Sequence, residues 1–363
     1  MACLKRGNMA QTVYDISVII CAYTEDRWDD LVASVESVQQ QTLSPKEIIV
    51  VVDHNPNLLK RVREHIAGVL AVENREVKGL SGARNSGVTV AQGAVIAFLD
   101  DDAIAEMNWL EHLAACYTDP HVLGVGGKIE PLWLGMRPAW LPEEFYWVVG
   151  CTYRGMPEAV QPIRNPIGAN MSVRRHTLMV VGGFRESFGC NHNTTEKGVA
   201  FVGPKWLQHH AGDEETEFCI RATRQWPDAV WLYTPSATIQ HRVPVQRTRW
   251  TYFLWRCYDE GLGKSTIVRL HGIRAGLSSE RTYTFKILLL GVMRSLTDTL
   301  FHRDPAGLAR AATIIVGLAA TTAGFLAGSL LVRAAAKDVV TGKKDHHGSG
   351  VGEGIALERE LPG

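Results

Sequence analysis

Three consecutive aspartates, Asp100, Asp101 and Asp102, directly follow an uninterrupted apolar run. Residues 95–99 (VIAFL) are typical of a strand buried on both faces of a parallel sheet. Three like charges at the end of such a strand repel one another unless a cation or donor groups lie among them, so the triplet predicts a divalent-metal site. The alternative is a solvated turn in which Asp102 caps the next helix, although a cap needs only one acid.

A second acidic group opens a predicted helix and consists of Asp213, Glu214, Glu215 and Glu217. The helix dipole stabilises an exposed acid at this place by less than about 1 kcal/mol, which would not select four of them. The group therefore predicts a general base. His241 follows a short predicted strand, and its place beside both acidic groups makes it a candidate third metal ligand. A lone histidine is nevertheless more often structural than catalytic.

The segment 79–87 (GLSGARNSG) is rich in glycine but lacks both the GxGxxG pattern and a Gly-Lys-Ser/Thr ending. Its glycines would let a helix begin close to a ligand, with Arg84 directed forward to a phosphate or a base. The alternative is a tight turn with Arg84 in solvent.

Three apolar runs separated by helical patterns predict the doubly wound half of an α/β domain. The runs are residues 16–22, 47–52 and 95–99. Parallel connections place the polar turns that follow such strands on one edge of the sheet. We therefore expect residues 23–26 and Asp53 to meet the aspartate triplet.

The chain has 363 residues, with 38 lysines and arginines against 38 aspartates and glutamates. This balance argues neither for nor against a polyanionic partner, and we expect no nucleic acid. The seven cysteines are scattered without metal-binding spacing, which suits a reducing compartment. The N-terminus has no apolar segment typical of a secretory signal, so we expect the catalytic part to be cytoplasmic.

The C-terminal part is expected to contact a membrane. Residues 312–332 carry no charge over about the length needed to span a bilayer, which predicts a transmembrane helix. Residues 283–301 are apolar but include charges, so they read as an interfacial helix or half of a hairpin. The expected divisions are a disordered N-terminus at 1–14, a catalytic domain at 15–265, an amphipathic helical segment at 266–311, the transmembrane helix at 312–332 and a disordered tail at 333–363. A mobile loop is expected at 190–210.

Several motifs in order resemble the inverting glycosyltransferases of family 2, which have the α/β GT-A fold. They are ISVIICAYTEDR, VVVDHN, GLSGARNSG, FLDDD, DEETEF and QHRVP, and the resemblance covers about residues 16–264. Within the family, some sequence segments are most similar to the glucuronosyltransferases that act on glucosyl-dolichyl phosphate: VVDHNP, FLDDDAIAEMNWL and WVVGCTY. The resemblance implies transfer of a sugar, with glucuronate as one candidate, from a UDP-sugar to a saccharide on a polyprenyl or dolichyl phosphate. It also implies Mn²⁺ or Mg²⁺ and an enzyme on the cytoplasmic face of the cell membrane, held by a single span or a hairpin.

The resemblance also implies roles for individual residues. Those that would hold the uracil are Ala22, Tyr23, Glu25 and Asp53. Arg84 would contact the base or the diphosphate. Asp100 and Asp101 would hold the ribose and support the metal, with Asp102 and His241 as its ligands. Glu215 occupies the position of the catalytic aspartate, and Glu214 stays open as the base.

Acceptor contacts are expected from aromatic and basic residues. Residues 246–250 (QRTRW) match the QxxRW motif of processive members, which makes Arg249 and Trp250 candidates. Trp147 belongs to an aromatic span, 131–155, which suits a carbohydrate or lipid-linked acceptor as well as ordinary loop packing. A glucuronate carboxylate could pair with Arg174, Arg175 or Lys205, each of which could equally be a surface charge.

Three other functions remain open. A membrane-tethered protein could bind a nucleotide sugar without turnover, although the pair Glu214 and Glu215 speaks against it. A nucleotidyltransferase or sugar-nucleotide hydrolase could use metal-bound acids, but a nucleotidyltransferase is expected to have a basic glycine-rich loop where this chain has CAYTEDR. A transferase could also use a different sugar in cell-wall or exopolysaccharide synthesis.

Overall fold

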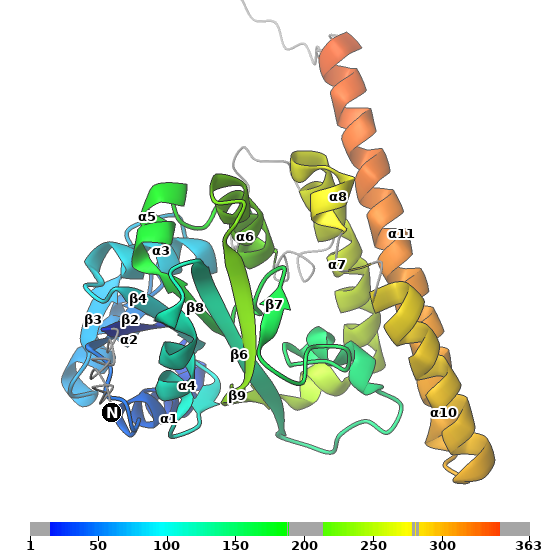
Figure 1. Ribbon diagram of the computed structural model, residues 1–363, viewed down its shortest axis with the longest axis horizontal. Helices are drawn as coiled ribbons and strands as arrows, with labels where there is room; N and C mark the ends of the chain where they lie inside the picture. The colour runs from blue at the N-terminus through cyan, green and yellow to red at the C-terminus, as the bar shows by residue number, and fades with distance from the viewer. Residues whose placement is uncertain (1–14, 187, 189–212, 278–279, 281–282, 342–363) are drawn as a thin grey trace, which may run out of the picture.

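The computed structural model describes residues 15–186, 188, 213–277, 280 and 283–341. Within them, nine strands form one mixed sheet in the order β3-β2-β1-β4-β8-β6-β9-β5, and β7 pairs with β9. Helices cover both faces of the sheet, and a long C-terminal helix extends along one side of the molecule (Figure 1). The predicted mixed α/β sheet is confirmed. The predicted N-terminal segment 1–14 and loop 190–210 lie outside the described residues.

The first half of the sheet is parallel, as the three apolar runs predicted. It consists of β1 (Ile16–Ala22), β2 (Glu47–Val52), β3 (Leu70–Glu73) and β4 (Val95–Asp100). Side chains alternate across a strand, so β1 sends Val18 into one hydrophobic core and Ile19 into another on the opposite face. The first core is covered by α1 (Trp28–Gln39), α2 (Pro56–His65) and α4 (Trp109–Ala115). The second is covered by α3 (Leu80–Val90), α5 (Arg175–Val181) and α6 (Glu214–Gln225).

The second half of the sheet mixes strand directions. Its strands are β5 (Ala103–Ala105), β6 (Val122–Trp133), β7 (Gln161–Ile163), β8 (Asn170–Arg174) and β9 (Val230–Val243). The strand β8 runs antiparallel between β4 and β6, whereas β9 runs parallel to β6. Both β5 and β7 pair antiparallel with β9.

The long strand β9 includes His241 near its end, whereas the sequence predicted that this residue follows a short strand. Thr234 of β9 lies opposite Gly127 of β6, but the next residue of β6, Lys128, lies opposite Thr238. Residues 235–237 therefore form a bulge, and the chain resumes the same ladder beyond it. Gly127 permits the close approach, because a Cβ there would lie 2.0 Å from the carbonyl oxygen of Ala237.

Short helices complete the domain, and longer ones form its C-terminal part. The short 3₁₀ helices are η1 (Glu25–Arg27), η2 (Cys116–Thr118), η3 (Glu143–Val149) and η5 (Val245–Thr248). The C-terminal elements are α7 (Trp250–His271), α8 (Ile273–Gly276), the π-helical η6 (Tyr283–Leu288), α10 (Leu289–Phe301) and α11 (Ala306–Thr341). Thus α11 begins before the predicted span at 312–332 and continues into the segment that was predicted as a tail.

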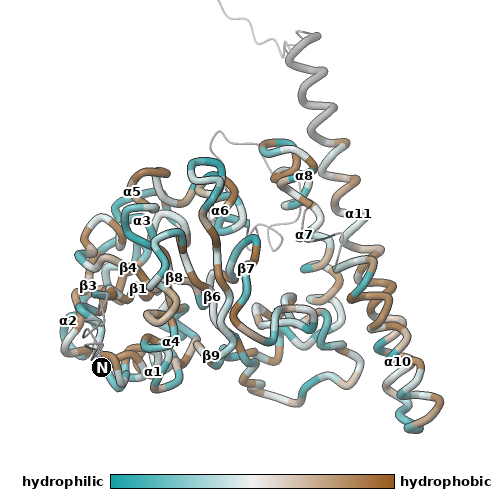
Figure 2. The backbone as a smooth tube through the Cα atoms, viewed as in Figure 1, coloured by the Kyte–Doolittle hydropathy of each residue, from teal (hydrophilic) through white to brown (hydrophobic). Residues whose placement is uncertain are grey.

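The helices α10 and α11 form an apolar hairpin (Figure 2). In the described part of the chain, one helix is long and apolar enough to cross a membrane, at Ala306–Leu330. Of its most apolar window, 33% is buried inside the protein. Leu308, Ile315 and Leu326 of this helix are exposed, so it has both a protein-facing and an outward side.

The protein-facing side of α11 packs closely on α7. A Cβ on Gly261 of α7 would lie 2.0 Å from the carbonyl oxygen of Thr321, and a Cβ on Gly324 of α11 would lie 1.9 Å from that of Tyr258. The two backbones thus approach at distances that only glycine permits, because any side chain would occupy the space of the facing backbone. This contact fixes α11 against the catalytic part of the chain.

Candidate active site

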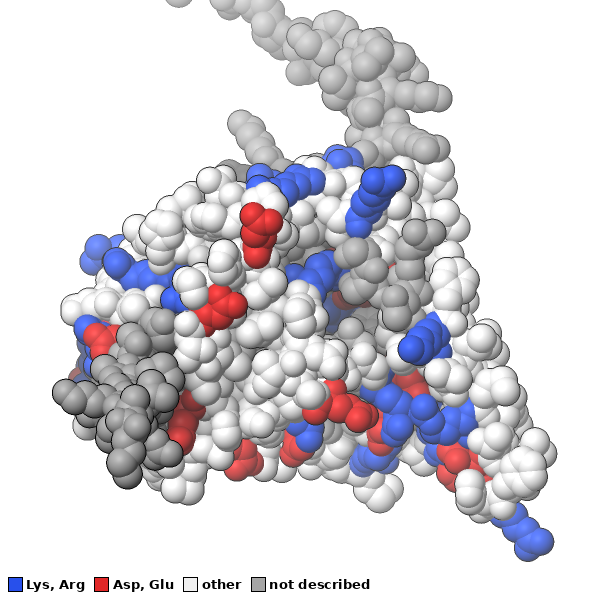
Figure 3. Space-filling model, in the orientation of Figure 1, with Lys and Arg blue, Asp and Glu red and all other residues white. Residues whose placement is uncertain are grey.

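A cavity of about 700 Å³ opens at the carboxyl ends of β1, β2 and β4. Figure 3 shows a hollow on the face of the molecule between the sheet and the C-terminal helices, with basic side chains inside it. Ala22, Tyr23, Asp53 and the aspartate triplet all line the cavity. Each of the three polar turns therefore contributes residues to one cavity at this sheet edge, although only Tyr23 of the expected residues 23–26 lines it.

Asp100, Asp102 and His241 form a cluster of potential metal ligands. One atom from each lies within 4.8 Å of the others. The strand β9 brings His241 here because that residue pairs with Ala103, directly after the aspartate turn. Its Nε2 is 3.2 Å from Asp102 Oδ1, and its buried Nδ1 has no hydrogen-bond partner among the described residues. Carboxylate oxygens and an imidazole nitrogen suit Mn²⁺ or Mg²⁺, so these residues fit the predicted metal.

Arg27 compensates part of the negative charge in the triplet. Its Nη1 lies 3.0 Å from Asp101 and 3.2 Å from Asp102. The pKa of Asp101 is raised to about 7, first by burial and second by the negative charge of Asp102. The positive charge of Arg27 acts in the opposite direction. Burial also acts to raise the pKa of Asp102, but His241 and Arg27 together hold that pKa well below its usual value. The sequence reasoning did not single out Arg27, although it belongs to the polar turn after β1.

Arg84 joins the two acidic groups. It is 2% exposed, so the interpretation of a solvated side chain is wrong. Its Nη1 lies 3.2 Å from Glu214 Oε1, and its Nη2 lies 3.7 Å from Asp100 Oδ1. The backbone passes close to the guanidinium at Gly168, where a Cβ would lie 2.8 Å from Nη2. Arg84 therefore fixes the start of α6 relative to the end of β4.

The acids at the start of α6 have different surroundings. Glu217 is fully buried and pairs with Arg185, Arg221 and His271, so its carboxylate holds α6 in place. Among the described residues, Glu215 makes no ion pair, and it lines the cavity half-buried. A carboxylate that faces a cavity without a partner is accessible to a substrate proton.

Burial changes the proton affinity of the same acids. The pKa of Glu214 is raised to about 8, first by burial and second by the negative charge of Glu215. The positive charge of Arg84 opposes this shift. Burial likewise raises the pKa of Glu215. A raised pKa makes each carboxylate a stronger base. The geometry favours Glu215, because Glu214 is already paired with Arg84.

Asp53 shapes the loop that precedes α3. Its Oδ1 accepts a 2.7 Å hydrogen bond from the side chain of Asn74, and its Oδ2 accepts a 3.0 Å bond from the backbone N–H of Gly79. Gly79 has a φ of 132°, which L side chains rarely adopt. Asp53 thus holds the glycine turn from which Arg84 reaches the site.

Three of the expected site residues do not line the cavity: Glu25, Arg249 and Trp250. Arg249 is exposed, and the Trp250 ring packs against Trp140 and Phe253 at centroid distances of 5.0 and 5.3 Å. The first turn of α7 therefore faces an aromatic cluster. Trp147 does line the cavity, and its Nε1 donates a 2.9 Å hydrogen bond to the hydroxyl of Tyr283.

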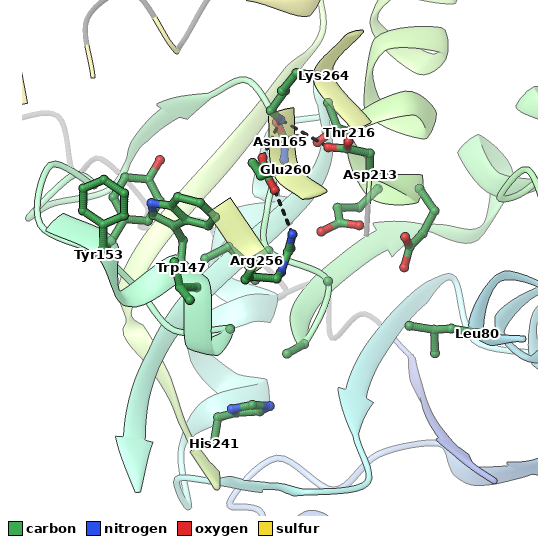
Figure 4. Close-up of a pocket in the computed structure, with 18 of the residues that line it drawn as sticks. Leu80, Trp147, Tyr153, Asn165, Asp213, Thr216, His241, Arg256, Glu260 and Lys264 are labelled. Atoms are coloured by element: carbon green, nitrogen blue, oxygen red, sulfur yellow. Dashed lines mark hydrogen bonds and ion pairs between the residues drawn. The ribbon is translucent and has the colours of Figure 1, made fainter. Parts of the chain in front are cut away.

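Several basic residues of the cavity were missed at the sequence level. Arg247 lines it two residues before Arg249. On α7, Arg256, Glu260 and Lys264 lie on one face and form part of the wall (Figure 4). Lys264 Nζ lies 3.1 Å from Glu260 and 3.2 Å from Asp213. The sequence held a signal for Arg256, Glu260 and Lys264, because side chains spaced by four residues share a helix face.

The two arginines considered for a glucuronate carboxylate lie elsewhere. Arg174 pairs in the sheet with Val95, at the opposite end of β4 from the aspartates. Its guanidinium donates to the carbonyl oxygens of Tyr117 and Val122. Arg175 follows it directly and does not line the cavity. Lys205 lies outside the described residues.

Comparison with known proteins identifies sequence relatives of this chain. The family model described as glycosyl transferase family 2 matches residues 17–182. A glucosyl-dolichyl phosphate glucuronosyltransferase from Haloferax volcanii is 32% identical over 319 residues, which cover 87% of this chain and 96% of the relative. A UDP-Glc:alpha-D-GlcNAc-diphosphoundecaprenol beta-1,3-glucosyltransferase from Escherichia coli is 34% identical over 91 residues, covering 24% and 35% of the two chains.

A solved structure is similar in outline. It is a mannosyltransferase from Pyrobaculum calidifontis in complex with GDP-Man and Mn²⁺, with a TM-score of 0.49 at 14% identity, covering 91% of this chain and 88% of that one. The sequence match to the Haloferax relative is more informative, because it extends over nearly the whole of both chains. The chain is therefore a hexosyltransferase of glycosyltransferase family 2, with the GT-A fold that its motifs predicted.

Proposed function

We propose that this enzyme moves a sugar from a UDP-sugar to a lipid-linked saccharide on a polyprenyl or dolichyl phosphate, with inversion at the anomeric carbon. The observation that carries the proposal is one shared cavity, in which the cluster of Asp100, Asp102 and His241 accompanies the carboxylate of Glu215, which makes no ion pair with the described residues. The names of two relatives support the substrates: one relative is named for UDP-Glc, the other for glucosyl-dolichyl phosphate.

The donor would bind at the carboxyl ends of β1 and β4. Ala22, Tyr23 and Asp53 line this part of the cavity and would surround the uracil. Asp102 and His241, joined by Asp100, would hold Mn²⁺ or Mg²⁺. When bound, the ion supplies positive charge that stabilises the leaving diphosphate.

Two arginines would complete the diphosphate site. Arg84 is fixed between Asp100 and Glu214, with its guanidinium lining the cavity. Arg247 also lines the cavity, and its charge contributes to the low pKa of Asp102. Guanidinium groups bind phosphate oxygens through paired N–H donors, so both residues suit this role.

Glu215 would act as the general base. It would take the proton from the acceptor hydroxyl as that oxygen attacks the anomeric carbon on the face opposite the diphosphate. Such a displacement needs a single carboxylate and no covalent intermediate, and it inverts the anomeric configuration. Glu214, held by Arg84, would stabilise the arrangement rather than accept the proton.

The membrane helices would bring the enzyme to its acceptor. The α10–α11 hairpin would hold the protein on the cytoplasmic face of the cell membrane, by one span or by the hairpin alone. Glucuronate is the candidate donor sugar because the Haloferax relative is named as a glucuronosyltransferase.

The test is release of UDP from a panel of UDP-sugars by membrane-bound enzyme, with polyprenyl-phosphate sugars as acceptors, with and without Mn²⁺ or Mg²⁺. Metal-dependent release for one sugar, stimulated by acceptor and lost in both Asp102→Ala and Glu215→Gln, is the expected result. Tight binding of UDP-sugars without release from any of them would overturn the proposal and favour a binding protein without turnover.

A further inference from the structure

The catalytic cavity has an apolar part that the sugar-transfer chemistry does not use. Besides the metal cluster, its wall includes residues from η6 and α11. Among them are Phe285, Leu288, Leu318, Thr321, Thr322 and Phe325. The helix predicted as a membrane span therefore forms part of the wall of the same cavity that contains Glu215.

Phe285 marks an opening of this cavity to the outside. Its side chain lines the cavity, yet the residue is 77% exposed. The next helix, α10, continues the apolar surface from this point, with Leu289 and Met293 also exposed. The surface beside this opening is thus mainly apolar, with the exposed Lys286 next to Phe285. An apolar surface with a flanking cation suits the interface of a bilayer.

The wall on the α11 side packs closely against α7 where it lines the cavity. Thr321 and Phe325 lie within the stretch that Gly261 and Gly324 bring against α7, and Leu318 lies one turn before it. Leu326, the residue after Phe325, is 55% exposed on the outward side. Neighbouring positions on one helix therefore face two different surroundings, the cavity and the outside.

A ligand that fills both parts of this cavity needs a polar head and a long apolar chain. We propose that the apolar part binds the hydrocarbon chain of the lipid-linked acceptor, which passes sideways from the bilayer between η6 and α11, beside Phe285, while its saccharide reaches Glu215. This inference rests on the proposed function for the nature of the acceptor, and it adds the path and the residues that contact the chain. A bulk phospholipid in the same space is the competing occupant.

Photocrosslinking can distinguish the two lipids without any sugar transfer. In the full-length enzyme in vesicles of phosphatidylglycerol with a trace of dolichyl phosphate, a photoreactive p-benzoylphenylalanine replaces Phe325 or, as the matched control, Leu326. We expect a dolichyl phosphate adduct at 325 and mainly a phospholipid adduct at 326. Phospholipid adducts at both positions, or no lipid adduct at 325, would overturn the proposal.

Kinetics supply a second test with a matched pair on α11. Leu318→Trp fills the apolar part of the cavity, whereas Leu308→Trp adds the same ring at a position that is 60% exposed and does not line it. The larger side chain should keep about two methylene groups of the acceptor's hydrocarbon chain out of the cavity, and each lost group costs about 0.8 kcal/mol. Leu318→Trp should therefore raise the KM for a long-chain acceptor about 10-fold. The KM for a short-chain acceptor with the same saccharide, and for the UDP-sugar, should stay unchanged.

The two proposals fail in different ways. Sugar transfer with equal KM values for long and short chains would refute the chain path and leave the transferase function standing. Adducts of dolichyl phosphate at 325 without transfer to any lipid-linked acceptor would refute the proposed function and retain the lipid-binding path.

Discussion

The guanidinium of Arg294, on α10, lies 2.9 Å from the buried carboxylate of Glu144, in η3. The Tyr283 hydroxyl also donates a 2.6 Å hydrogen bond to the Glu144 carbonyl oxygen. The η3 helix ends at Val149, and a Cβ on the next residue, Gly150, would lie 3.3 Å from the ring of His241. The apolar hairpin is therefore connected to the metal cluster through a single short helix.

We expect Arg294→Leu to destabilise the protein, because it removes the hairpin's partner for a buried carboxylate. Losing one hydrogen-bonded partner of a buried group typically costs about 1–3 kcal/mol. Urea unfolding in detergent would measure the loss. The double variant Arg294→Leu/Glu144→Leu should recover part of it because no buried charge is left; equal losses in the single and double variants would contradict this account.

Glu215→Gln and Glu217→Gln should separate catalysis from stability. Glutamine cannot accept the acceptor's proton, so Glu215→Gln should lower kcat by about 100-fold or more while the affinity for UDP-sugar persists. Glu217 pairs with Arg185, Arg221 and His271, so Glu217→Gln should chiefly lower the midpoint of thermal unfolding. A normal kcat in Glu215→Gln would shift the role of base to Glu214.

Mn²⁺ should raise the unfolding temperature of the wild-type enzyme even without donor. A ligand at 100 times its Kd stabilises the folded state by about 2.7 kcal/mol. His241→Ala removes one potential ligand and should reduce this shift, whereas His121→Ala, at an exposed position outside the cavity, should retain it. An identical shift in His241→Ala would place the ion elsewhere.

Asp259 should make stability depend on pH. Burial raises the pKa of this carboxyl from 3.8 to about 7, against the opposing charge of Arg256, and its Oδ2 has no hydrogen-bond partner among the described residues. Between these two pH values the folded state keeps a proton that the unfolded chain releases, so stability falls as pH rises through that window.

The variant Asp259→Asn tests this dependence, because an amide does not titrate. Urea unfolding from pH 5 to pH 7.5 should show a shallower decline for Asp259→Asn than for the wild type, by on the order of 2 kcal/mol over the range. Parallel declines in the two proteins would show that Asp259 is already ionised in the folded state.

The parallel half of the sheet and its edge were predictable because they depend on local patterns. Residues 16–22, 47–52 and 95–99 are continuous apolar runs that end in polar turns, and parallel connectivity alone brings those turns together. The placement of Asp53 and Asp102 in one cavity followed directly. The continuity of β9 did not, because it depends on a bulge that only the pairing with Gly127 reveals.

The part of the site that was missed depends on contacts between distant segments. Arg27 pairs with Asp101 and Asp102 across 74 residues or more, and Lys264 pairs with Asp213 across 51. Neither pairing follows from the surrounding sequence. Trp250 is a different case: a motif suggested an acceptor contact, and in the structure the ring packs on Trp140 and Phe253 and does not line the cavity.

The packing of α11 on α7 also has a practical consequence. Apolar C-terminal helices are often deleted to obtain a protein that can be purified without detergent. Here a version that ends before Ala306 would lose Leu318, Thr321 and Phe325 from the cavity wall and uncover the glycine face of α7. Inactivity of such a shortened enzyme would report a damaged active site, so assays and inhibitor screens need the full-length protein.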